Sequence, residues 1–100
     1  MDEEAVNNRL RELVDIFLGN GVRITPPLAL EEKFADRQQL MVAVQTMMMQ
    51  TLHEIASAEV TMCGFYEGEA LSKAVNNKFN QIMQEEYFPD RNNNQSSYIN

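Results

Sequence analysis

The residue best suited to acid–base chemistry in this 100-residue sequence is its single histidine, His53. A general base needs a nucleophile or an orienting carboxylate within hydrogen-bond reach. On a helix its neighbours are the residues three and four positions away. These are Met49, Gln50, Ala56 and Ser57. None of them is a carboxylate, and Cys63 lies roughly 15 Å further along such a helix. We therefore expect His53 to be a surface or interface residue, whose contacts could respond to pH.

Carboxylates occur in close pairs, which is the second arrangement with chemical potential. The pairs are Glu3-Glu4, Glu31-Glu32, Glu67 with Glu69, and Glu85-Glu86. A di-metal helical bundle uses a Glu-x-x-His motif, and Gln50 occupies the required position before His53. The single Cys63 has no disulfide partner and no set of zinc ligands around it. The sequence therefore predicts no catalytic, cofactor or metal site, and it predicts that the chain is not an enzyme.

The run Met47-Met48-Met49 is the most informative feature of the chain. Three consecutive helical residues point in three directions, so they cannot all face one core. Met47 and Met48 share a face with other apolar residues, whereas Met49 belongs to a second stripe. Steps of seven residues define that stripe, which comprises Val42, Met49, Ala56 and Cys63. Val60 lies beside it on the helix. A helix with two apolar sides is either central in its own domain or shared with another subunit. The sequence leaves both alternatives open.

Three helices must position these residues. The apolar spacing predicts a first helix from Glu3 to Leu18 and a last helix from Glu69 to Tyr87. A long central helix is expected from about Leu28–Leu30 to Met62, with a kink near residues 35–37 and an uncertain end. The predicted fold class is all-α: a small three-helix bundle or helical hairpin with a long central helix, an extended proline linker over residues 22–27 and a polar C-terminal tail. We expect one domain over residues 1–89 and a flexible or partner-ordered tail over 90–100.

Two stretches of the chain are nearly alike: AVNNRLRELV from Ala5 and AVNNKFNQIM from Ala74. Both place apolar residues at i, i+4, i+7 and i+8, and both place an Asn-Asn pair on the other side. The flanking residues do not match, which argues against a duplicated functional element. We expect two outer helices that bury the same apolar positions against the central helix.

Charge and composition limit the partners. Fifteen acidic and eight basic residues give a net charge of −7, which repels nucleic acid phosphates and anionic membranes. The acidic start of the chain is unlike a signal peptide, and no segment supplies the 20 or so apolar residues that a spanning helix needs. We therefore expect no direct nucleic acid partner and no membrane. The lone cysteine favours a reducing, cytoplasmic compartment or a particle assembled inside a cell.

These features favour a non-catalytic helical interaction or assembly protein. It would oligomerise, or dock on a larger protein partner, through its Met-rich central helix. Short chains with these traits are typical of phage or viral accessory and virion proteins. The alternative is an acidic inhibitor that mimics nucleic acid or blocks a nucleic-acid-binding enzyme, because net −7 over 100 residues permits it. The predicted interface residues are Val42, Met49, His53, Ala56, Val60, Cys63, Tyr98 and Ile99.

Overall fold

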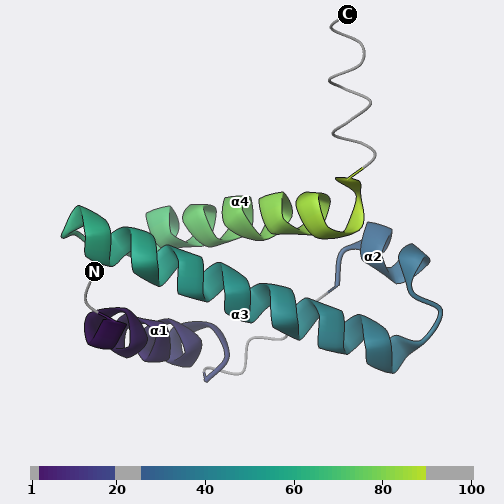
Figure 1. The fold of residues 1–100 in the computed structure, drawn as a ribbon, viewed down its shortest axis with the longest axis horizontal. Helices are drawn as coiled ribbons and strands as arrows, with labels where there is room; N and C mark the ends of the chain where they lie inside the picture. The colour runs from purple at the N-terminus through teal and green to yellow at the C-terminus, as the bar shows by residue number, and fades with distance from the viewer. Residues whose placement is uncertain (1–2, 20–25, 90–100) are drawn as a thin grey trace, which may run out of the picture. The chain divides into compact units, whose positions relative to one another are not determined.

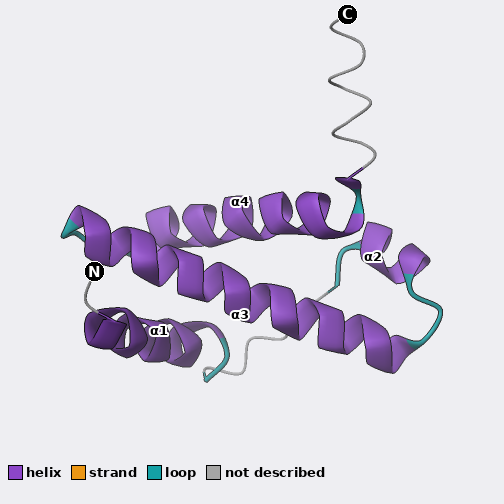
Figure 2. Cartoon of the chain, in the orientation of Figure 1, coloured by secondary structure: helices purple, strands orange, loops and turns teal. Residues whose placement is uncertain are grey.

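The computed structural model describes residues 3–19 and 26–89, and within these ranges the chain is all-α, as predicted. Figures 1 and 2 show the helices, and no described residue forms a strand. The helices are α1 Glu3–Phe17, α2 Leu28–Lys33, α3 Arg37–Met62 and α4 Gly68–Tyr87. The linker residues 20–25 and the tail residues 90–100, including Tyr98 and Ile99, lie outside the described residues.

The chain divides into two compact units, Met1–Phe65 and Tyr66–Asn100. The first unit contains α1, α2 and α3, and the second contains α4. The expectation of a single domain over residues 1–89 stays a prediction.

The kink that the sequence predicts near residues 35–37 is a complete break between α2 and α3. Phe34 and Asp36 both adopt extended backbone angles, with φ of −106° and −95°. The Asp36 side chain accepts a hydrogen bond of 2.8 Å from the backbone N–H of Gln38. Such a cap satisfies one of the free N–H groups at a helix start, which favours a new helix over continuation of the old one. The chain therefore has four described helices, one more than the sequence predicted.

The C-terminal end of α3 is set by Cys63, which takes the left-handed conformation with φ 57° and ψ 30°. The backbone N–H of Cys63 donates to the Val60 carbonyl at 3.2 Å, and that of Gly64 donates to the Glu59 carbonyl at 3.3 Å. These bonds satisfy carbonyls that the end of a helix leaves without partners. The end of this helix, which the sequence left uncertain, therefore lies at Met62.

In the first unit, α1 packs along the C-terminal half of α3. Val6 and Leu13 of α1 are buried, and Leu30 of α2 is completely buried. The buried residues of α3 are Leu40, Ala43, Val44, Met47, Thr51, Leu52, Ile55, Ala56 and Glu59. The buried Thr51 donates its hydroxyl to the Met47 carbonyl at 2.7 Å, so its polar group has a partner inside the core.

The two Ala-Val-Asn-Asn segments bury two of their four shared apolar positions in both helices, whereas Leu10 is half-buried where Phe79 is buried. Helix α4 buries Leu71, Val75, Phe79 and Ile82 on one face, as the sequence predicted. Val6 and Leu13 of α1 correspond to Val75 and Ile82 of α4, and all four are buried. The Asn pairs at positions 7–8 and 76–77 are exposed in both helices. The repeated sequence is therefore a repeated amphipathic pattern, in which the apolar residues are buried or half-buried and the asparagines are exposed.

Candidate functional site

A buried ion pair joins α1 to the end of α3. Arg9 donates two hydrogen bonds to Glu59, from Nε to Oε1 at 3.0 Å and from Nη2 to Oε2 at 2.9 Å. The Glu59 side chain has no exposed surface, and only 11% of the Arg9 side chain is exposed. Arg9 also pairs with Glu12 at 2.9 Å, and its guanidinium lies 4.7 Å from the centre of the Phe65 ring. The side-chain hydrogen bond to Glu59 is the main reason why the pKa of Arg9 is raised.

Sequence analysis did not single out this pair, although a signal was present. Glu59 follows Ile55 by four residues and Ala56 by three, so a helix places it among apolar neighbours. A carboxylate in such a position requires a cation or several donors, because burying an unpaired charge costs several kcal/mol. Nothing in the sequence, however, says which of the basic residues supplies the partner. The ion pair holds two helices together and is not placed to act on a substrate.

The predicted interface residues of α3 are partly on the surface. Val42 is 57% exposed and Met49 is 42% exposed, while His53 is also exposed and Val60 is half-buried. Ala56 is completely buried, so it cannot contribute to a surface contact. Cys63 is exposed, but it follows α3 in the left-handed conformation and does not continue the helical stripe.

The exposed members of the predicted interface on α3 lie in a strip of residues that carry no formal charge. We call it the uncharged strip. It comprises the exposed residues of α3 from position 38 to position 53: Gln38, Gln39, Val42, Gln45, Thr46, Met49, Gln50 and His53. At 1.5 Å per residue this strip is about 22 Å long. The Thr46 hydroxyl donates to the Val42 carbonyl at 2.8 Å, which ties that polar group to its own helix.

The other exposed helix faces differ from this strip. The exposed side of α1 carries Glu3, Glu4, Arg11, Glu12 and Asp15, and that of α4 carries Glu69, Lys73, Glu85 and Glu86. An uncharged exposed surface four turns long is therefore a particular property of α3 among the described helices. Uncharged polar and apolar groups are cheaper to remove from water than charged ones.

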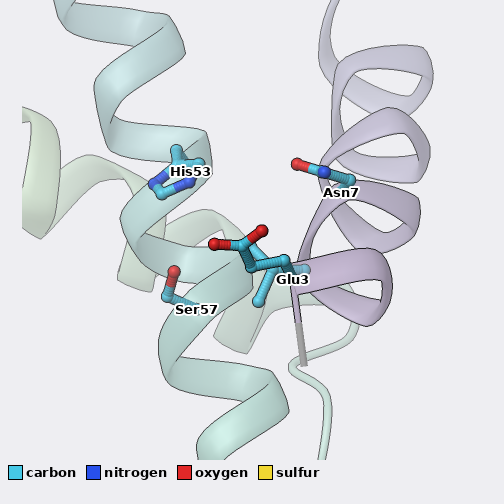
Figure 3. Close-up of a pocket in the computed structure, with 5 residues that line it drawn as sticks. Glu3, Asn7, His53 and Ser57 are labelled. Carbon is cyan, nitrogen blue, oxygen red and sulfur yellow. The ribbon is translucent and has the colours of Figure 1, made fainter. Parts of the chain in front are cut away.

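A hollow of about 430 Å³ lies between α1 and α3, at the end of the uncharged strip. Its lining consists of Glu3, Val6 and Asn7 from α1 and of His53 and Ser57 from α3. Figure 3 shows the Glu3 carboxylate pointing into the space between His53 and Ser57, and the Asn7 amide pointing toward His53. The helix neighbours of His53 include no carboxylate, and the packing of α1 on α3 brings one from about fifty residues away. Sequence reasoning missed this neighbour because it depends on tertiary contact.

Glu3, His53 and Ser57 are the residue types of a nucleophile, a base and an orienting carboxylate. Among the described residues no hydrogen bond joins any two of these side chains. Ser57 lies inside α3, where helical hydrogen bonding occupies the backbone N–H groups that an oxyanion hole would need. The described residues also contain no group of three or more metal-ligating side chains. The hollow is lined by hydrogen-bond donors and acceptors together with the apolar Val6.

Comparisons with protein-family models, with curated proteins and with solved structures gave no match. Among the described helices, none combines the length and the apolar character that are needed to cross a membrane.

Proposed function

We propose that this chain is a non-catalytic helical interaction protein that binds a protein partner through the uncharged strip of α3. The observation that supports the proposal is the exposure of Val42 and Met49 in a helix face without formal charge. The partner is a second copy of the chain or a larger protein. An accessory or structural role in an intracellular particle of phage or viral type is consistent with this mode of action.

The cost of desolvation favours the uncharged strip as the contact surface. A chain with net charge −7 presents carboxylates over much of its surface, and a partner must compensate each charge that it buries. The strip lowers this cost, because its own polar groups are amides, a hydroxyl and an imidazole. The carboxylate of Glu54 lies at its edge, where it accepts a hydrogen bond of 3.4 Å from Gln50. Val42 and Met49 supply apolar area, and methionine adapts its shape to different partners.

No specific observation on the described residues favours the alternative function, an acidic mimic of nucleic acid. Such a mimic requires exposed carboxylates at regular intervals along one face. Glu59 is buried against Arg9, and the uncharged strip occupies the longest helix. A salt titration separates the two proposals, because binding through carboxylates weakens steeply with salt, whereas binding through the strip changes little.

The test places a photo-crosslinking amino acid at position 49 and, as a control, at exposed position 77 of α4. An extract of the cells that naturally make the chain is then irradiated. We expect a discrete adduct from position 49, either with the chain itself or with another protein, and loss of this adduct when Val42 is replaced by Asp. The control position should give no comparable adduct. If position 49 gives no more adduct than position 77, the strip is not an interface and the proposal is wrong.

The second measurement compares Met49→Asp with Met48→Asp. Met49 is 42% exposed, whereas Met48 is half-buried beside the core residue Met47. A carboxylate at position 49 should leave helicity unchanged and weaken association about a hundredfold, because a partner would have to desolvate an unpaired charge. At position 48 it should reduce helicity. If both variants unfold equally, the strip belongs to the core and not to an interface.

A further inference from the structure

Three exposed residues of α1 form a row that is complementary to itself. Glu3, Asn7 and Arg11 are spaced by four residues, so they follow one another along the helix at about 6 Å per step. Glu3 is negatively charged, Asn7 is neutral and Arg11 is positively charged. Glu3 and Asn7 also line the hollow. Two copies of such a row can pair antiparallel around their central asparagines. Each Glu3 then faces the Arg11 of the other copy.

The side chains of this row are available for such a contact. In the part of the chain that the structure describes, neither Glu3 nor Arg11 takes part in a hydrogen bond or ion pair through its side chain. Arg9, only two residues before Arg11, is nearly buried and bound to Glu59. The two arginines of α1 therefore have different environments, and Arg11 is the one that a second molecule can reach.

We propose that the partner is a second copy of this chain, and that Arg11 of each copy occupies the hollow beside Glu3 of the other. This inference rests on the proposed function and names its partner. An arginine guanidinium is planar and carries five N–H donors. The hollow presents the Glu3 carboxylate, the Asn7 amide and the Ser57 hydroxyl as acceptors around one space (Figure 3).

Charge complementarity favours a second copy as the occupant. Two chains of net charge −7 repel each other, so a stable contact between them requires surfaces that are either uncharged or reciprocally paired. The row on α1 is reciprocally paired, and the strip on α3 is uncharged. His53 belongs to both the strip and the lining of the hollow, so the two features are continuous. An antiparallel pairing of two identical rows has twofold symmetry, and twofold dimers are the commonest protein oligomers.

A charge-swap series tests this pairing by sedimentation equilibrium of the purified chain. The variants are Glu3→Arg, Arg11→Glu and the combination of both, with Glu4→Arg as the matched control. Each dimer contains the pair twice, so either single swap should weaken dimerisation by about tenfold. The double swap restores complementary charges and should return the dissociation constant to within about threefold of the original. Glu4 lies next to Glu3 at the start of α1 but does not line the hollow, so Glu4→Arg should not weaken the dimer.

The design separates a specific pair from a general charge effect. Glu3→Arg and Glu4→Arg both raise the net charge by two from −7, which lowers the repulsion between copies. If only net charge mattered, Glu3→Arg would strengthen association, and that result would overturn the inference. A double swap that does not rescue dimerisation, or a chain that stays monomeric at all accessible concentrations, would overturn it as well. Circular dichroism of each variant shows that the helices remain intact. If position 49 crosslinks to a different protein while the charge swaps have no effect, the proposed function stands and this inference fails.

Discussion

Removing the positive partner of the buried ion pair should be one of the most damaging single changes in the first unit. Arg9→Met keeps most of the apolar stem but leaves the Glu59 carboxylate, which has no exposed surface, without the guanidinium. The two hydrogen bonds that are lost measure 3.0 and 2.9 Å, and each involves two charged groups. Breaking a buried pair by deleting one member costs about 3–5 kcal/mol. This is a large fraction of the 5–15 kcal/mol that typically stabilises a small domain.

The assay is urea denaturation followed by far-ultraviolet circular dichroism, with Glu12→Gln as the matched control. Glu12 also pairs with Arg9, but 64% of its side chain is exposed, so its loss should cost at most about 1 kcal/mol. Replacing both members, with Arg9→Met and Glu59→Leu, removes the buried charge together with its partner. The double variant should therefore recover most of the lost stability. If Arg9→Met costs no more than Glu12→Gln, the pair does not hold α1 to α3 and the reasoning is refuted.

The pH dependence of this contribution follows from the raised pKa of Arg9, whose first cause is the hydrogen bond to Glu59. A cationic group with a higher pKa in the folded state stabilises the fold at every pH below its unfolded pKa. The stabilisation disappears only as the pH rises through the folded-state pKa, which lies in the strongly alkaline range. The cost of Arg9→Met should therefore be the same at neutral and at mildly alkaline pH. Denaturation of the wild type and the variant at both pH values measures it.

Three further changes test the fold. Leu13→Ala should destabilise the first unit by about 3–5 kcal/mol, because Leu13 is completely buried, while Asn8→Ala on the exposed side should be nearly neutral in the same denaturation assay. Cys63→Gly should stabilise the chain by up to about 1 kcal/mol, because Cys63 has a φ of 57° that glycine adopts without strain; a lower denaturation midpoint would contradict this. Asp36→Ala should cost about 0.5–2 kcal/mol through loss of the cap on Gln38, and unchanged stability would show that the cap does not decide where α3 begins.

The sequence by itself determined the helical class and most of the buried positions. Periodic apolar residues located α1 and α4 to within one or two residues, because a helix repeats every 3.6 residues and must bury one face. The shared spacing predicted that Val6, Leu13, Val75, Phe79 and Ile82 are buried, and they are, whereas Leu10, Val14 and Met83 of the same pattern are half-buried. The same argument placed Val42 and Met49 away from the core face. It failed for Ala56, because periodicity along one helix does not show how much of its circumference its neighbours cover.

Only the tertiary structure decided which distant residues meet. The partner of Glu59 is Arg9, fifty positions away, and the carboxylate nearest His53 in the hollow is that of Glu3. Local spacing cannot reveal such contacts, because they depend on the rotation of α1 about its axis and on its position along α3. Burial along α3 also depends on packing: Ala56 is completely buried, whereas Met49, seven residues earlier on the same helix, is 42% exposed. The sequence therefore specified the faces of each helix, and the packing of the helices specified which side chains became a site.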